Sequence, residues 1–157
     1  MSRGAVKIVP MRRAHVSACD EIVAASEPWK RLGERIDFRR ILSQDRLLVR
    51  AYVCTEGREP LGFVLFTPEP VFARGGYLRA IGVSPAMRRR GIGKKLLSFA
   101  EKAVSGKSPI LYLCVSSFNR RAQAFYRSMG YSRVGKLPGL ILSGAAEYIY
   151  WKWLKRS

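Results

Sequence analysis

The chain has 157 residues, of which 48% are hydrophobic and 25% are charged. This length and balance are typical of one globular domain with its own core, and they exclude a disordered or fibrous chain. Lysine and arginine number 29 against 11 acidic residues, so the formal net charge is +18. We therefore expect a single domain over residues 1–157 with an anionic partner: nucleic acid, a membrane surface or a phosphate-rich small molecule. A solvated basic surface without such a partner is the alternative.

The first part of the chain predicts a strand followed by helices. Residues 4–9 are rich in strand formers and end at Pro10, and residues 13–26 carry apolar side chains at helical spacing. The opening has no apolar stretch long enough for a signal peptide, which favours structure there. Residues 27–36 mix proline, glycine and charge without a clear pattern, and residues 37–42 predict a second short helix.

The rest of the chain alternates between strand and helix patterns. Two apolar runs flank the polar stretch TEGREP and predict an antiparallel hairpin over residues 47–54 and 61–66. The later elements are expected as strand 77–83, helix 94–104, strand 110–117, helix 119–130, and strands 131–137 and 147–154. This order predicts a mixed α/β fold in which the strand at 110–117, apolar almost throughout, is covered on both faces.

Cysteine and histidine usage argues against a metal site. Cys19, Cys54 and Cys114 form no CxxC pair and His15 is the one histidine, so a zinc site would lack ligands. We expect three reduced, mostly buried thiols and a cytoplasmic protein, with a catalytic cysteine as the lesser alternative. No run approaches the roughly 20 apolar residues of a membrane helix, so no membrane partner is expected.

A basic glycine loop lies between the expected strand at 77–83 and the helix that follows. Arg88 to Gly93 read RRRGIG, and Lys94 and Lys95 follow directly. Backbone N–H groups at a helix start lack intrahelical partners and bind anions, and glycine lets a phosphate approach closely. A nucleotide P-loop is excluded because Lys95 stands where Ser or Thr is needed, and a dinucleotide loop because Leu96 replaces its third glycine.

The loop resembles the pyrophosphate loop of the GNAT (Gcn5-related N-acetyltransferase) superfamily. That loop has Gln or Arg, two residues, Gly, one residue, then Gly or Ala, and Arg88, Gly91 and Gly93 match its fixed positions. Two longer blocks, YLRAIGVSPAMRRRGIGKKLL and SFNRRAQAFYRSMGYSRVG, are similar to the family's central segments. The resemblance implies a central mixed, mostly antiparallel sheet with helices on both faces and splayed fourth and fifth strands.

The resemblance also implies an acyltransferase that uses acetyl-CoA as cosubstrate and acts on a primary amine of a small molecule or protein. The pantetheine arm would lie along the fourth strand, the pyrophosphate on the loop, and Arg89 or Arg90 would meet the remaining phosphate. The implied cofactor-binding residues are Ile81, Gly82, Val83, Arg88, Arg89, Arg90, Gly91, Ile92, Gly93, Lys94, Asn119 and Tyr126. Gly82 offers no side chain to obstruct the arm, and Asn119 is also suited to cap the next helix.

By the same resemblance, Tyr126 would protonate the departing thiolate, the alternative being packing beside Phe125. Tyr77 stands where several protein-modifying members carry a glutamate, so a direct carboxylate base is missing there. We hypothesise that Glu147 is the base instead; a water relay, or an ordinary surface charge at this position, are the alternatives. Candidates for the wall of the acceptor pocket are Trp29, Tyr77, Leu140 and Trp151.

Other function classes stay open. A nucleic-acid-binding domain would explain the charge, but aromatic and basic residues do not alternate along one strand and no recognition helix is evident, so nucleic acid is not the expected partner. A non-catalytic acyl-CoA-binding member is another alternative, although the loop and Tyr126 are retained. The sequence does not decide between a protein N-terminal or lysine acceptor and a small amine, nor between monomer and homodimer.

Overall fold

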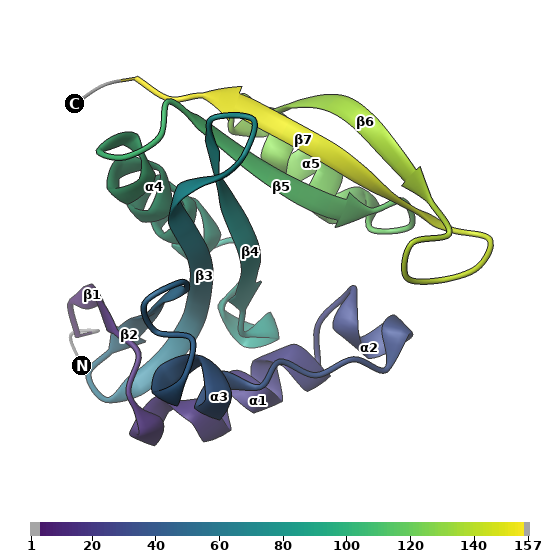
Figure 1. Cartoon of the computed structure of the whole chain (residues 1–157). Coiled ribbons are helices and arrows are strands. Elements are labelled where there is room, and N and C mark those ends of the chain that lie inside the picture. Colours follow the sequence, from purple (N-terminus) through teal and green to yellow (C-terminus); the bar gives the residue numbers. More distant parts are fainter. Residues whose placement is uncertain (1–3, 156–157) are drawn as a thin grey trace. The chain divides into compact units, whose positions relative to one another are not determined.

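A computed structural model describes residues 4–155 of the chain. These residues contain the strands β1 (Val6–Pro10), β2 (Arg50–Glu56), β3 (Glu59–Phe72), β4 (Gly75–Val83), β5 (Ile110–Ser116), β6 (Ser132–Pro138) and β7 (Ala146–Trp153). The helices are α1 (Val16–Ala24), α2 (Trp29–Leu32), α3 (Phe38–Ser43), α4 (Ile92–Ser105) and α5 (Arg120–Ser128), with 3-10 turns η1 (Arg13–His15) and η2 (Pro85–Met87). Figure 1 labels the helices and strands.

The described strands form one seven-stranded sheet in the order β1-β2-β3-β4-β5-β7-β6. β4 and β5 pair in parallel, whereas the pairs β1–β2, β2–β3, β5–β7 and β6–β7 are antiparallel. The predicted mixed α/β fold is therefore confirmed. The parallel register joins Gly75–Leu78 to Ile110–Leu113, while β4 continues to Val83 and β5 to Ser116.

The described chain divides into two compact units, each of which is described by itself. Unit 1 comprises residues 4–66 and 80–100, and unit 2 comprises residues 67–79 and 101–155. β3, β4 and α4 each contribute residues to both units. The expectation of a single domain stays a prediction.

Unit 1 has helices on both faces of its strands. On one face, α1 and α3 pack on β2 and β3, and the Phe38 and Phe63 rings meet edge to face with centroids 5.0 Å apart. On the other face, Gly62 lets α4 approach, because a Cβ there would lie 3.0 Å from Leu96 Cδ1. The buried face of α4 has the expected helical spacing, with Ile92, Leu96, Leu97 and Ala100 at most 2% exposed.

Unit 2 has a helix on one face of its strands, and Figure 1 shows α5 behind β5 and β7. Tyr126 of α5 packs on Tyr131, and the ammonium group of Lys152 on β7 lies over the Tyr131 ring. Gly76 allows close packing on the same face, since a Cβ there would lie 2.8 Å from Val104. Burial of the alternate β5 residues Leu111, Leu113 and Val115 anchors this face.

The structure differs from the sequence-based expectations mainly in the irregular segments. The helix expected at 13–26 is a 3-10 turn followed by α1, which ends at Ala24. The segment 27–36 contains the unpredicted α2, whose Trp29 packs near Phe63 with ring centroids 6.0 Å apart. β3 continues through Pro68 and Pro70 to Phe72 instead of ending at residue 66.

The three cysteines are free thiols; Cys19 and Cys54 are buried and Cys114 is half-buried. Burial raises the pKa of Cys19 to about 12, which makes it a structural residue rather than a nucleophile. None of the helices in residues 4–155 is both long enough and apolar enough to span a membrane. In that same range, no three His, Cys, Asp or Glu side chains are grouped so that they could hold a metal ion.

Candidate active site

The glycine loop lies in unit 1, between η2 and the first turn of α4. Arg89 and Gly91 both have positive φ angles, +65° and +76°, so the backbone curls twice before the helix begins. Within residues 4–155, the backbone N–H groups from Arg89 to Lys94 donate to no protein acceptor, and the first bond is from Lys95 to the Gly91 carbonyl at 3.0 Å. Six consecutive donors at the positive end of a helix fit a phosphate group.

The arginines of the loop differ in what their side chains contact. Arg88 Nη2 donates to Ser26 Oγ at 3.2 Å. Arg90 is held by Met87 and by Glu56, with 3.6 Å between its Nη2 and Glu56 Oε1. Arg89 is exposed. Of the two arginines considered for the remaining phosphate, Arg89 is therefore better suited.

The end of β4, where the pantetheine arm was expected, also lies in unit 1. Ile81 and Val83 are half-buried and Gly82 is buried. A Cβ on Gly82 would lie 2.5 Å from the Phe63 ring and 3.1 Å from Ile22. Core packing thus explains the glycine at 82, and the idea that it leaves a ligand unobstructed stays a prediction. The backbone role of these three residues stays a prediction.

In unit 2, Asn119 and Tyr126 occupy α5. The Asn119 side chain accepts a hydrogen bond from the Ala122 N–H at 3.2 Å and caps the helix, as expected. Tyr126 is 7% exposed, with its ring near those of Phe125 and Tyr131. Burial, and then the nearby Tyr77, raise the Tyr126 pKa, so this hydroxyl stays protonated near neutral pH.

Tyr77 of β4 and Cys114 of β5 lie together. The two side chains are near enough for each to influence the pKa of the other. Burial is the largest cause that raises the pKa of each group, and the nearby charge of Glu147 raises both further. Tyr77 and Cys114 are therefore both protonated near neutral pH, so neither is suited to be a base.

Glu147 is buried, with 7% exposure, so the alternative of an ordinary surface charge is wrong. Ser116 Oγ donates to Glu147 Oε1 at 2.6 Å, and the two residues are partners across the β5–β7 ladder. Buried carboxylates are rare outside functional or paired positions. Tyr77, Cys114 and Glu147 come from the neighbouring strands β4, β5 and β7, and the charge of Glu147 raises the pKa of the other two residues.

Sequence reasoning missed Ser116 and Gln123, and it did not connect Cys114 with Tyr77 and Glu147. Cys114 and Ser116 alternate on β5, and the Gln123 amide of α5 donates to the carbonyls of Ser116 and Ser117 at 3.2 and 3.0 Å. Polar residues two apart within an apolar strand were a visible signal, because alternate residues share a sheet face. Their pairing with Glu147 depends on strand order, which the sequence did not specify.

The predicted site residues thus form two groups. Unit 2 contains Tyr77, Tyr126 and Glu147, of which Glu147 raises the pKa of Tyr77 and Tyr77 raises that of Tyr126. Unit 1 contains the loop Arg88–Lys94, the end of β4 and Trp29, which is half-buried against Phe63. Trp29 contacts the apolar core of unit 1, and its role toward an acceptor stays a prediction.

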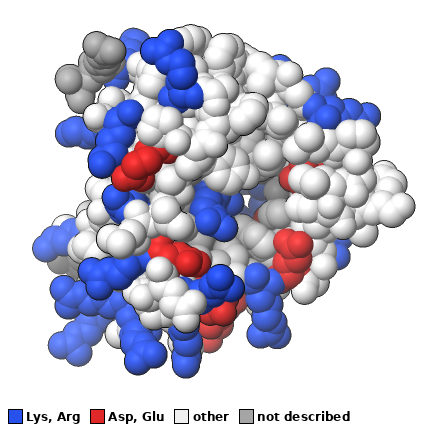
Figure 2. Space-filling model, viewed as in Figure 1, with Lys and Arg blue, Asp and Glu red and all other residues white. Residues whose placement is uncertain are grey.

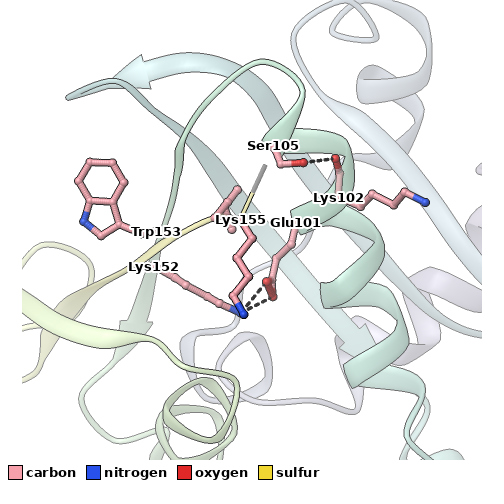
Figure 3. A pocket seen from close by; sticks show the side chains of 7 residues that line it. Glu101, Lys102, Ser105, Lys152, Trp153 and Lys155 are labelled. Carbon is pink, nitrogen blue, oxygen red and sulfur yellow. Dashed lines mark hydrogen bonds and ion pairs between the residues drawn. The ribbon is translucent and has the colours of Figure 1, made fainter. Parts of the chain in front are cut away.

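A separate hollow of about 470 Å³ lies in unit 2 between the end of α4 and the end of β7. It is lined by Glu101, Lys102, Ser105, Lys152, Trp153, Leu154 and Lys155. Figure 3 shows Lys152 directed at Glu101, with 2.8 Å between Nζ and Oε2. None of the predicted site residues lines this hollow.

Comparisons with known proteins agree with the architecture. The model of the acetyltransferase (GNAT) family matches residues 15–131. The chain is 43% identical over 58 residues to the N-alpha-acetyltransferase RimI of Mycobacterium tuberculosis, a match that covers 37% of this chain and 35% of that protein. It is 33% identical over 82 residues to the peptidyl-lysine N-acetyltransferase YjaB of Salmonella typhimurium, and this match covers 52% of this chain and 49% of that protein.

The chain therefore spans about half the length of these curated relatives or less. Among solved structures, yncA from Salmonella typhimurium, a putative acetyltransferase determined with its cofactor acetyl-CoA, has a TM-score of 0.75. The identity is 18%, and the match covers 98% of this chain and 96% of that one. Such a match establishes the fold.

Proposed function

The chain belongs to the GNAT acetyltransferase family, and from this premise we propose that it transfers an acetyl group from acetyl-CoA to a primary amine. The observation that carries the proposal is the row of backbone N–H groups from Arg89 to Lys94 at the start of α4. A diphosphate needs several convergent donors and positive charge, and this loop supplies both. The acetyl-CoA bound by yncA of Salmonella typhimurium is in line with this ligand.

Each residue of the loop has a distinct part in the proposed binding. The N–H groups hold the pyrophosphate, the exposed Arg89 meets the remaining phosphate, and Arg88 fixes the loop through Ser26. The backbone of Ile81–Val83 binds the pantetheine arm. When bound, acetyl-CoA supplies the thioester whose carbonyl carbon accepts the amine nitrogen.

The transfer requires two proton movements, because the amine nitrogen loses a proton and the departing sulfur gains one. Tyr126, whose hydroxyl is protonated near neutral pH, donates its proton to the sulfur. Glu147 takes the amine proton, held in orientation by Ser116 at 2.6 Å. Tyr77 and Cys114, both with raised pKa values, position the acceptor as neutral groups.

A thiol-release assay with acetyl-CoA and a panel of small amines, peptides and proteins tests this function. The expected result is release that depends on the acceptor, with the acceptor gaining the mass of one acetyl group. Binding of acetyl-CoA without release for any acceptor would identify a non-catalytic acyl-CoA-binding protein instead. A cytoplasmic location is part of the same proposal, since acetyl-CoA is an intracellular metabolite.

A further inference from the structure

The sheet face of unit 2 opposite α5 is not covered by a helix of that unit (Figure 1). Alternate residues of β7 share this face with their ladder partners on β5. The pairs are Glu147 with Ser116, Ile149 with Cys114, Trp151 with Tyr112, and Trp153 with Ile110. The catalytic cluster proposed above and a set of aromatic residues therefore lie on one continuous face.

The aromatic residues form an unbroken row, which we call the aromatic strip: Phe72, Tyr112, Trp151 and Trp153. Ring centroids are 5.3 Å apart for Phe72–Tyr112, 6.2 Å for Tyr112–Trp151 and 5.8 Å for Trp151–Trp153. The two ends are open, since Phe72 is 62% and Trp153 is 59% exposed. Figure 3 shows the Trp153 ring pointing away from the Lys152–Glu101 pair.

The structure holds the strip in place. Tyr112 lies across Gly75, where a Cβ would come within 2.3 Å of its ring, and its hydroxyl donates to the Ala73 carbonyl at 3.3 Å. A fixed, partly exposed row of large apolar side chains is a binding surface, because water contact with such groups is unfavourable.

The charge distribution limits what covers the strip. Figure 2 shows an uncharged surface over β5 and β7, although the chain carries a net charge of +18. A nucleic acid needs cations along its backbone, which this face does not offer. A second copy would bring another +18 and is opposed by repulsion. An apolar segment of a polypeptide fits best.

We propose that the aromatic strip binds an apolar segment of a polypeptide acceptor whose amine is acetylated beside Glu147; this inference rests on the proposed function. Trp151 and Trp153 are four and six residues from Glu147 on β7, which is roughly 13 and 20 Å along a strand. An extended peptide advances about 3.3–3.6 Å per residue. Side chains about four to six residues from the reacting amine therefore reach the strip.

Two peptides of about ten residues test this. They differ only at the fourth to sixth residues from the amine: one peptide has leucine and tryptophan at these positions, and the other has serine. The apolar peptide should have a kcat/KM about tenfold to hundredfold higher, the effect expected from burying one or two large apolar side chains. In the double variant Phe72→Ser/Trp153→Ser, both peptides should react at the rate of the polar one, with unchanged acetyl-CoA affinity and unchanged turnover of a short amine.

The control is Leu47→Ser, which removes another apolar side chain, 80% exposed, from unit 1 and should keep the preference. Equal rates for the two peptides with the wild-type protein, or a preference that persists in the double variant, would overturn this inference and leave the proposed function standing. A dimer that dissociates only in the double variant, with the peptide preference intact, would assign the face to a second copy. No turnover with any amine would overturn the proposed function and this inference with it.

Discussion

Replacing Glu147 by glutamine removes one charge from the proposed site and changes little else. The amide has nearly the shape of the carboxylate and can still accept a hydrogen bond from Ser116 Oγ, which lies 2.6 Å from Glu147 Oε1 in the wild type. If Glu147 takes the amine proton, turnover should fall by about 10²–10⁴-fold, the usual effect of a general base. Acetyl-CoA affinity should not change.

The effect should depend on the pKa of the acceptor. A lysine-like amine has a pKa of about 10.4 and a peptide α-amine about 7.7–8.0, so lysine needs more help from a base near neutral pH. The loss in Glu147→Gln should therefore be larger for the lysine acceptor and shrink as the pH approaches the pKa of the amine. In Glu147→Gln the charge-assisted hydrogen bond from Ser116 becomes a neutral one. The free energy of unfolding should fall by about 1 kcal/mol, which lowers Tm by about 2–4 °C.

The assay is thiol release against pH with saturating acetyl-CoA, with Glu101→Gln as the matched control. Glu101 is another partly buried carboxylate of unit 2, and it pairs with Lys152. Its loss should leave the rate profile unchanged. If Glu147→Gln gives the same rate against pH as the wild type with the best acceptor, direct base catalysis by Glu147 is wrong and a water relay replaces it.

Three further predictions test other parts of the structure. Tyr126→Phe should lower turnover by about 10²-fold or more without changing acetyl-CoA affinity measured by calorimetry, whereas equal turnover would leave Tyr126 a packing residue. Gly82→Ala should cost about 1–3 kcal/mol in urea unfolding, because its Cβ lies 2.5 Å from Phe63; an unchanged midpoint would refute this packing. Burial, then Arg12, lowers the pKa of His15 in the folded protein. Neutral His15 therefore stabilises the fold above its ordinary pKa of about 6.5, and this stability is lost as the pH falls from that value toward the folded-state pKa. The urea midpoints at two pH values should differ less in His15→Gln than in wild type.

The sequence predicted the elements with strong local signals. The amphipathic spacing of α4, the hairpin turn between β2 and β3, and the Asn119 cap all depend on residues close in the chain. α2 has no such signal, since it is four residues long and is stabilised by Trp29 packing on Phe63. The extension of β3 through Pro68 and Pro70 could not be predicted, because proline usually indicates that a central strand has ended.

The candidate catalytic cluster was predicted in part. Tyr126 was identified from the family resemblance, and Glu147 was proposed because Tyr77 stands where several family members carry a glutamate; all three lie in unit 2. Ser116 was not identified, and Cys114 was considered only under the lesser alternative of a catalytic cysteine, because Glu147 comes to lie opposite Ser116 only when β7 pairs with β5. Strand order is a long-range property, and local patterns do not encode which strands become neighbours.

Calorimetric titration of acetyl-CoA into wild type, Gly91→Leu and Gly57→Leu tests the central claim most directly. Gly91 and Gly57 both have positive φ, +76° and +61°, and neither has a heavy atom within 4 Å of an added Cβ. Leucine therefore imposes the same backbone penalty of roughly 1–2 kcal/mol at each site. We predict that wild type and Gly57→Leu bind acetyl-CoA with affinity that falls as salt rises, and that Gly91→Leu does not bind. Equal affinity in all three proteins, or no binding by wild type, would contradict the assignment of the loop Arg88–Lys94 to the pyrophosphate.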